Sequence, residues 1–223
     1  MDCIAHRGFG EVNPENTLAA VESAVATGAD AIELDIRRCG SGDLVVVHDE
    51  TVDRVTGASG AVSELSAAAL GELSVLGSGE GVPRLGAVCR ATPPNVRLNL
   101  ELKERGIAAE AVGTARQHGH EPIISSQSTA ALAEVESVPR GYVFPDEPER
   151  RLREATHIHC AAVHPHWHLC TESFLAAARE RDLAVRAWTV TEQTVTTDLA
   201  SVGVDGLIAD APAYCGVGRD SGP

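Results

Sequence analysis

Short apolar runs alternate with alanine-rich, helix-forming stretches along almost the whole chain. Runs typical of buried strands cover 3–6, 31–37, 96–102, 122–126, 140–144, 160–164, 184–190 and 205–209. Helical stretches lie between most of them, at 16–27, 106–118, 128–136, 147–155, 171–181 and 192–201. This order predicts an α/β fold, a TIM-type (β/α)8 barrel. The alternative is an open doubly wound sheet, but polar motifs recur at strand ends and no GxGxxG follows the first strand.

The segment after the second strand breaks this alternation. A glycine-rich turn at 39–43 precedes an extended run at 44–47, which predicts a hairpin arm that returns to the barrel. Residues 50–83 are rich in glycine and serine, with one short helical stretch near 64–72. We expect one barrel domain over 1–223, in which 50–83 is a short insertion over the barrel mouth, where the strands' C-terminal ends lie.

Two of the predicted strands carry charged side chains on one face. Glu33 and Asp35 alternate with apolar residues, so both carboxylates point the same way, about 6.5 Å apart. Asn99, Glu101 and Lys103 repeat the pattern. An antiparallel sheet with both rows in water is possible, but a barrel interior fits the βα alternation better, and unpaired carboxylates are costly there. A hard divalent cation, Mg²⁺ or Ca²⁺, would compensate them.

Two histidines stand at strand ends beside this acidic set. His6 ends the first strand, and His48 ends the hairpin return. Imidazoles exchange protons near neutral pH, so two of them on opposite sides of a phosphorus atom would act as base and acid. Arg7 would bind phosphate oxygens, and Gly8 allows close approach of the backbone. Lys103, the only lysine of the chain, also indicates an anionic substrate.

Together these motifs resemble the glycerophosphodiester phosphodiesterase family, over essentially the whole chain and most firmly over 1–57. The matching series is His6-Arg7-Gly8, Pro14-Glu15-Asn16-Thr17, Glu33-Leu34-Asp35, Val46-Val47-His48-Asp49, Glu101-Leu102-Lys103 and Trp188-Thr189-Val190. The resemblance implies a TIM-type barrel with a small insertion after the His-Asp motif. It also implies an enzyme that hydrolyses a glycerophosphodiester to sn-glycerol 3-phosphate and an alcohol.

The resemblance assigns a role to each site residue. It implies that one divalent metal, Mg²⁺ or Ca²⁺, is bound by three carboxylates, that two histidines form the acid/base pair, and that two cations hold the phosphate. These sets are Glu33, Asp35 and Glu101; His6 and His48; and Arg7 and Lys103. We expect Trp188 to pack against the glycerol moiety, Glu15 to orient Arg7, and Asn16 or Thr17 to cap the first helix.

Two other functions stay open at this point. Another barrel phosphodiesterase, of the phosphoinositide or sphingomyelin type, would share the two histidines and the metal, but long apolar mouth loops are missing from 50–83. A non-catalytic phosphate-binding module would have lost a histidine or a ligand first. The chain departs from the family at Gln127, Thr191 and 83–87. With aromatics at 3%, these changes favour a polar alcohol group over a lipid tail.

The composition of the chain disfavours some classes of binding partner and of cellular location. The formal net charge of −14 disfavours nucleic acid, and no apolar run reaches the roughly 20 residues of a membrane span. A high GC content of the genome would explain why the chain uses arginine in place of lysine. The excess of acidic residues is not explained in this way and would suit a cytoplasm of very high salt concentration. The N-terminus lacks signal-peptide features, and the six cysteines form no CxxC pair, so we expect a cytoplasmic enzyme with free thiols. The oligomeric state is not indicated.

A histidine-rich stretch covers 157–170. It holds five of the nine histidines, and its HxHxH string would bind zinc if alternate side chains converged. The simpler interpretation, which we favour, is a strand followed by an exposed loop at the barrel mouth. His164, at the strand exit, is then a candidate for substrate contact.

Overall fold

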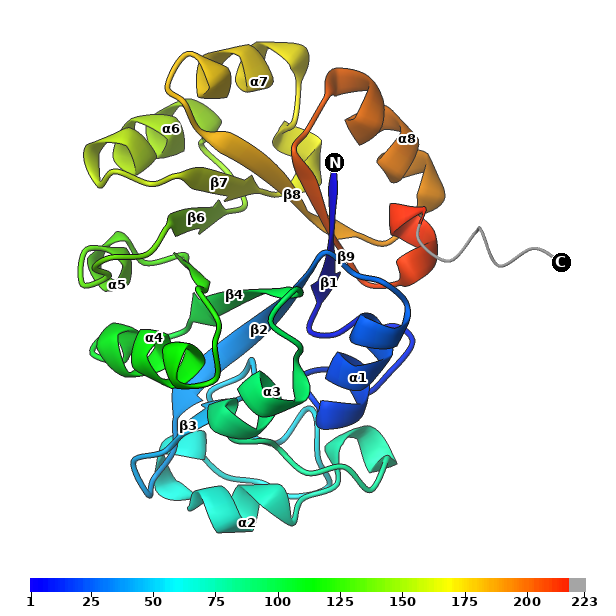
Figure 1. Ribbon diagram of the computed structural model, residues 1–223, viewed down its shortest axis with the longest axis vertical. Helices are drawn as coiled ribbons and strands as arrows, with labels where there is room; N and C mark the ends of the chain where they lie inside the picture. The colour runs from blue at the N-terminus through cyan, green and yellow to red at the C-terminus, as the bar shows by residue number, and fades with distance from the viewer. Residues whose placement is uncertain (217–223) are drawn as a thin grey trace, which may run out of the picture.

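A closed parallel barrel forms the centre of the computed structural model, which describes residues 1–216 (Figure 1). Its strands are β1 (Asp2–His6), β2 (Ala31–Arg38), β4 (Arg97–Leu102), β5 (Ile123–Ser126), β6 (Arg140–Phe144), β7 (Ala162–Pro165), β8 (Ala184–Val190) and β9 (Gly206–Ala209). Neighbouring strands are parallel around the ring, and β1 pairs with both β9 and β2, which closes it. The additional strand β3 (Leu44–Val46) pairs antiparallel with the end of β2. The predicted barrel and hairpin arm are therefore confirmed.

Helices surround the barrel on its outer side (Figure 1). They are α1 (Leu18–Ala26), α3 (Leu85–Ala91), α4 (Ala108–Gln117), α5 (Thr129–Leu132), α6 (Pro148–His157), α7 (Glu172–Arg179) and α8 (Gln193–Val202). The short helix α2 (Ala67–Gly71) lies apart from them, in the segment after β3, and 3₁₀ turns occur at Val62–Glu64, Val75–Gly77, Trp167–Leu169 and Pro212–Cys215. The sequence pattern did not predict α3. No described helix is both long and apolar enough to cross a membrane.

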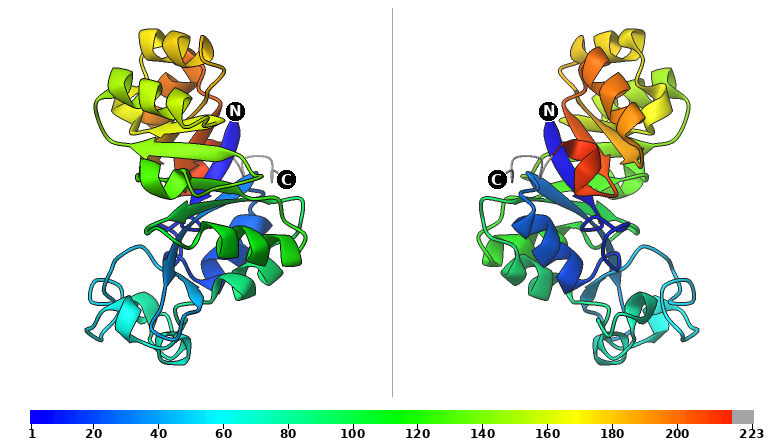
Figure 2. Two further views of the ribbon diagram at one scale, coloured as in Figure 1. Left: turned by 90° about the vertical axis from the view of Figure 1, so that its left-hand side faces the viewer. Right: turned by 90° about the vertical axis from the view of Figure 1, so that its right-hand side faces the viewer.

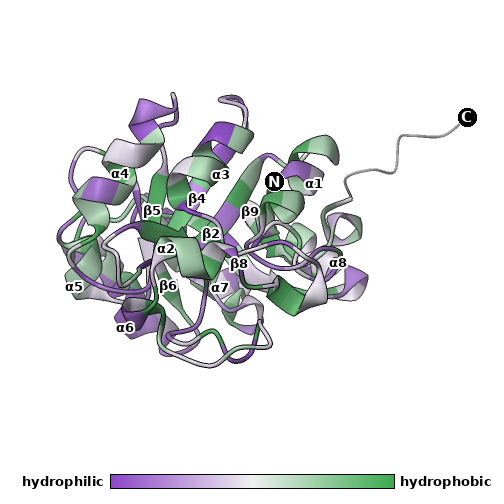
Figure 3. Ribbon diagram, turned by 90° about the horizontal axis from the view of Figure 1, so that it is seen from below, coloured by the Kyte–Doolittle hydropathy of each residue, from purple (hydrophilic) through white to green (hydrophobic). Residues whose placement is uncertain are grey.

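The main hydrophobic core lies between the strands and these helices. On β2, the alternate residues Ile32, Leu34 and Ile36 are fully buried in this layer. Figure 3 shows the same division, with apolar strands inside and polar segments on outer helices such as α4 and α6. Because side chains alternate along a strand, Glu33 and Asp35 must point into the barrel. The packing of the helices thus determines the orientation of the acidic residues.

Residues 47–83 pack around a second, smaller core of their own. It consists mainly of valines and leucines of this segment, with Cys39 and Val45 from the hairpin. Both side views show the segment at one end of the molecule, beside β3 (Figure 2). Arg84 forms an isolated bridge with Val45, and α3 then returns the chain to the barrel. The insertion is therefore anchored at its start and its end on the hairpin that bears His48.

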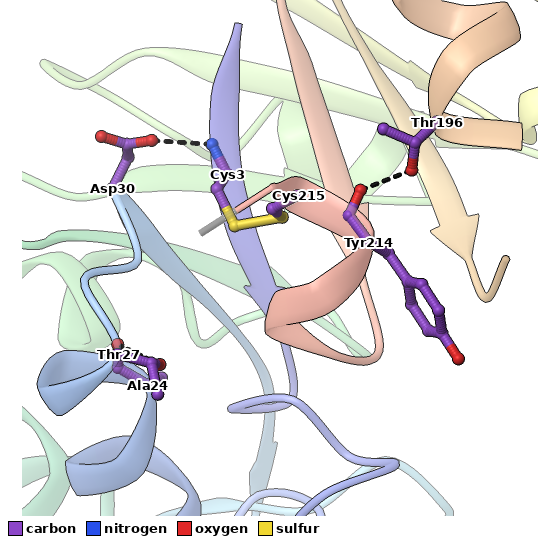
Figure 4. Close-up of a disulfide and its surroundings, with 7 residues drawn as sticks. All are labelled: Cys3, Ala24, Thr27, Asp30, Thr196, Tyr214 and Cys215. Atoms are coloured by element: carbon purple, nitrogen blue, oxygen red, sulfur yellow. Dashed lines mark hydrogen bonds between the residues drawn. A yellow bond between two sulfur atoms is a disulfide. The ribbon is translucent and has the colours of Figure 1, made fainter. Parts of the chain in front are cut away.

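A disulfide links the first strand to the segment after the last one. Cys3 on β1 is bonded to Cys215, with their Cα atoms 5.4 Å apart (Figure 4). The expectation that all six cysteines are free thiols is wrong for this pair. The reason is barrel closure: β9 pairs with β1, so the turn after β9 brings Cys215 beside Cys3 although 212 positions separate them. The other four cysteines are free and buried.

Replacing Cys215 by serine is expected to lower the free energy of unfolding by about 2–4 kcal/mol, because the crosslink restricts the unfolded chain. Chemical denaturation of the oxidised wild type and of Cys215→Ser measures the difference. Adding dithiothreitol should lower the stability of the wild type only. If the reductant changes neither protein, the bond does not form in solution.

Candidate active site

Three carboxylates meet inside the barrel on two adjacent strands. Glu33 and Asp35 come from β2, Glu101 comes from β4, and Asp35 is paired in register with Glu101. One oxygen of each lies within 4.8 Å of the others. Glu33 and Asp35 are only 2% and 1% exposed. The acidic trio predicted from strand alternation is thus a real cluster, largely removed from water.

The charge of Asp35 is compensated by protein groups. Its carboxylate lies 2.8 Å from Lys103 Nζ and 3.1 Å from Arg7 Nε, and it accepts a hydrogen bond from Asn16 Nδ2 at 2.8 Å. Burial opposes ionisation, but Lys103 and Arg7 outweigh it and hold the pKa of Asp35 well below its usual range. Lys103 also lies 2.6 Å from Glu101. Asp35 is therefore ionised at neutral pH.

Glu33 has no such compensation. It accepts the backbone N–H of Arg7 on Oε2 at 3.2 Å, while Oε1 is buried without a hydrogen-bond partner among the described residues. Burial, and next the negative charge of Asp35, raise the pKa of Glu33 to about 8. An oxygen-preferring divalent cation between these carboxylates would pair the unpartnered oxygen and remove the repulsion. The donor set therefore fits such an ion.

His6 is held by an aspartate from the opposite end of the sequence. Its Nδ1 lies 2.5 Å from Asp210 Oδ1, and its Nε2 is 3.9 Å from Glu33 Oε2. Burial disfavours the charged imidazole, but the hydrogen bond to Asp210 and the charge of Glu33 outweigh burial and raise the pKa of His6. With Nδ1 engaged, Nε2 is the atom left to exchange a proton inside the barrel.

His48 is oriented in the same way from the insertion side. Its Nδ1 lies 2.6 Å from Asp49 Oδ1, and Arg54 Nε donates to the other oxygen of Asp49 at 2.5 Å. Arg54 also donates two hydrogen bonds to Glu15, which accepts a third from Arg7 at 2.8 Å. The network Arg7–Glu15–Arg54–Asp49–His48 thus ties the first strand's loop to the insertion. The expected pairing of Glu15 with Arg7 is present.

One pocket brings most of the predicted residues together. Its lining includes seven of the eight, namely His6, Arg7, Glu33, His48, Glu101, Lys103 and Trp188. Asp35 lies behind them, covered by Lys103 and Arg7. Asn99, Gln127 and His164 also line the pocket. The arrangement combines a carboxylate cluster that fits a cation, two fixed positive charges and two oriented imidazoles, which suits displacement at a phosphorus atom.

The structure shows which residue caps α1 and which element the backbone of Gly8 approaches. Thr17, not Asn16, caps α1 by accepting from the N–H of Ala20 at 3.2 Å, whereas Asn16 binds Asp35. Gly8 has φ +79°, and a Cβ there would lie 2.7 Å from the Cβ of Ala20. The glycine therefore allows the loop to approach α1.

The histidine-rich stretch does not converge on one point. His164 lies inside the barrel and is 1% exposed, whereas His166 and His168 contact each other in the turn that follows. His157 ends α6. Within residues 1–216, the only group of three or more potential ligand side chains close enough to share an ion is Glu33, Asp35 and Glu101.

The sequence patterns missed the partners of the two imidazoles. Asp210 follows the last strand directly, and His6 is the final residue of the first, so this position at a strand end was the available signal. Asp49 was noticed only as part of a motif, and Arg54 was not singled out. The contact of Arg54 with Glu15, 39 positions away, depends on how the insertion folds back, which no local pattern encodes.

Comparisons with known proteins agree with this geometry. The sequence model of the glycerophosphoryl diester phosphodiesterase family matches residues 6–121 and 124–214. A glycerophosphodiester phosphodiesterase of Caldanaerobacter subterraneus subsp. tengcongensis is 29% identical over 227 residues, which cover 94% of this chain and 93% of the relative.

Solved structures are similar over nearly the full length. A phosphodiesterase of Oleispira antarctica, in complex with the product sn-glycerol-3-phosphate, is 26% identical with a TM-score of 0.89, covering 97% of this chain and 96% of that one. A glycerophosphodiester phosphodiesterase of Thermotoga maritima is 25% identical with a TM-score of 0.82, covering 94% of both.

Proposed function

The chain belongs to the glycerophosphoryl diester phosphodiesterase family and is a phosphoric diester hydrolase, and we propose that it converts glycerophosphodiesters to sn-glycerol 3-phosphate and an alcohol. The observation that supports this most is the single pocket lined by His6, His48, Glu33 and Glu101. The proposal extends over residues 1–223 as one phosphodiesterase domain, with 50–83 as an insertion at the barrel mouth.

Glu33, Asp35 and Glu101 would hold one divalent cation, Mg²⁺ or Ca²⁺. When bound, the ion would neutralise the acidic cluster and withdraw electron density from a phosphoryl oxygen. Lys103 uses two of its three N–H donors on Asp35 and Glu101, so the third is left for a phosphate oxygen. Arg7 supplies further donors from the adjacent strand end. These fixed charges stabilise the negative charge that develops at phosphorus.

His6 and His48 are the proposed acid/base pair. In direct hydrolysis, one imidazole takes a proton from water as its oxygen bonds to phosphorus. The other imidazole donates a proton to the alcohol oxygen as its bond to phosphorus breaks. A cyclic route, in which the neighbouring glycerol hydroxyl attacks first and water then opens the ring, uses the same two groups. Asp210 and Asp49 position the rings through Nδ1.

A panel of glycerophosphodiesters tests the function. Glycerophosphocholine, glycerophosphoethanolamine and glycerophosphoglycerol are incubated with Mg²⁺, Ca²⁺, Mn²⁺ or chelator, and released sn-glycerol 3-phosphate is measured. We expect turnover of at least one diester, with polar alcohol groups preferred because the amide of Gln127 lines the pocket. Hydrolysis of sphingomyelin or a phosphoinositide with no glycerophosphodiester turned over would establish the alternative function.

Changing Asp210 to asparagine is expected to lower kcat/KM about 10- to 100-fold, less than loss of the imidazole itself. The hydrogen bond to Asp210 raises the pKa of His6. Removing the charge of Asp210 should therefore shift the part of the pH–rate profile that depends on His6 to lower pH. Steady-state rates from pH 5 to 9 measure both effects. A variant with reduced activity and an unshifted profile would contradict the positioning role.

Cation affinity is expected to rise with pH. Glu33, with a pKa of about 8 before the ion binds, is protonated at lower pH and must lose that proton to become a ligand. Affinity for Ca²⁺ should therefore increase about tenfold per pH unit from 6 to 8 and level off above 8. Calorimetric titrations across this range measure it. Glu33→Gln should bind weakly with little pH dependence, and a pH-independent wild type would refute the linkage.

A further inference from the structure

Besides Glu33, three uncharged polar side chains inside the barrel have buried atoms without a hydrogen-bond partner in residues 1–216. They are Asn99, through both amide atoms, Ser125, through its hydroxyl oxygen, and His164, through both ring nitrogens. Each residue is at most 2% exposed. Buried polar atoms are almost always paired in folded proteins. The unpaired atoms of these side chains are therefore suited to pair with a small polar group.

The three residues are next to the acidic cluster. Asn99 is paired in register with Glu33, and Ser125 with Glu101. Asn99 and His164 line the same pocket as the carboxylates. We call Asn99, Ser125 and His164 the polar floor.

The position of His164 depends on a glycine. A Cβ on Gly141 would lie 2.7 Å from Cε1 and Nε2 of the imidazole, so only glycine leaves room for the ring. Gly141 is itself paired in register with Ser125 on the neighbouring strand. The ring of His164 therefore extends over β6 toward β5. This brings its unpaired nitrogens to the side of the barrel that holds Ser125.

The polar floor differs in chemistry from the charged groups around the carboxylate cluster. Amide, hydroxyl and neutral imidazole groups both donate and accept hydrogen bonds, as an alcohol does. Burial, and next the charge of Arg186, lower the pKa of His164 to about 3, so the imidazole is neutral. Around the cation site, by contrast, the carboxylates only accept, and Arg7 and Lys103 only donate. Those groups suit a metal ion and phosphate, whereas the floor suits uncharged hydroxyls.

We propose that the polar floor binds the free hydroxyl groups of the glycerol half of the substrate. The phosphate then lies at Arg7 and Lys103, and the departing alcohol points to the open end of the pocket. Selectivity for glycerol would come from the buried floor, and tolerance of different alcohols would come from the mouth. This inference rests on the proposed function, since it assigns one part of the same substrate.

Product binding tests the floor without turnover. sn-Glycerol 3-phosphate and propyl phosphate have the same phosphate and carbon chain, but only the first has hydroxyls. Calorimetry in Ca²⁺ buffer should show the wild type binding sn-glycerol 3-phosphate at least about tenfold more tightly. In His164→Leu this ratio should fall toward one, while His164→Asn keeps an amide and part of the preference. Ser125→Ala, the gentlest change, should lower the ratio severalfold.

His120→Leu is the matched control. His120 is also a buried histidine, but it bonds to the backbone carbonyl of Cys89 and does not line the pocket. The ratio of the two affinities, for sn-glycerol 3-phosphate and for propyl phosphate, should be the same in His120→Leu as in the wild type. Thermal melts confirm that all variants are folded. Equal binding of the two phosphates by the wild type, or an unchanged ratio in both His164→Leu and Ser125→Ala, would overturn the inference.

The two proposals fail in different ways. If glycerophosphodiesters are hydrolysed but the wild type does not discriminate between the two phosphates, the floor is wrong and the function stands. If discrimination is present but no glycerophosphodiester is turned over, the function is wrong and hydroxyl recognition by the floor stands.

Discussion

Replacing His6 by asparagine is expected to lower kcat for glycerophosphodiester hydrolysis by about 10²- to 10⁴-fold, the usual contribution of a positioned acid or base. His48→Asn should have an effect of the same order. Asparagine keeps a polar atom near the position of Nδ1 for the hydrogen bond to Asp210 or Asp49 but removes Nε2, the proton-exchanging atom. Steady-state kinetics at saturating substrate and cation measures the loss.

For this test, His6→Asn and His48→Asn must differ from the wild type in proton transfer and not in folding or cation binding. Melting temperature and Ca²⁺ affinity should stay close to the wild-type values, because neither histidine belongs to the carboxylate trio. His157→Asn, at the exposed end of α6, is the control and should retain full activity. Near-normal rates in either active-site variant would remove that histidine from the proposed pair.

Removal of divalent cations is expected to abolish turnover, and Glu33→Gln should weaken cation affinity by about 10- to 100-fold. The substitution keeps the shape of the side chain but removes the charge, leaving two carboxylates, one of them already paired with Lys103 and Arg7. Excess Ca²⁺ should restore part of the activity of Glu33→Gln. Activity as a function of free cation measures both quantities.

The exposed Glu22 on α1 offers a matched control, since Glu22→Gln removes the same charge outside the site. Its cation requirement should equal that of the wild type. Undiminished hydrolysis after exhaustive chelation would refute the role of the trio as a cation site.

Strand alternation made much of the barrel and its acidic interior predictable. A residue two positions from Glu33 must share its face, so Asp35 followed from β2 alone. The same rule placed Glu101 of β4 on the same face as Lys103, which directly follows that strand. The observed bounds of β6 and β8 equal the predicted ones. These features depend on neighbours in sequence, which is why pattern reasoning found them.

Features that depend on closure of the barrel could not be predicted from the sequence patterns. The contacts of His6 with Asp210 and of Cys3 with Cys215 join residues 204 and 212 positions apart, and a single Asp or Cys has no periodicity. The helix α3 was missed for a local reason: it spans seven residues, contains Gly86 and has no side-chain cap. Its packing against α1 and α4, and not its own propensity, accounts for it.

The separate small core of the insertion has a consequence for how this protein can be diversified. Because residues 47–83 bury their own apolar side chains, loops there can be exchanged while the interior of the barrel stays intact. Any such chimera must retain Arg54, because its hydrogen bonds to Glu15 and Asp49 hold the imidazole of His48 in place relative to the barrel. Libraries that retain this arginine can therefore vary the insertion without displacing His48.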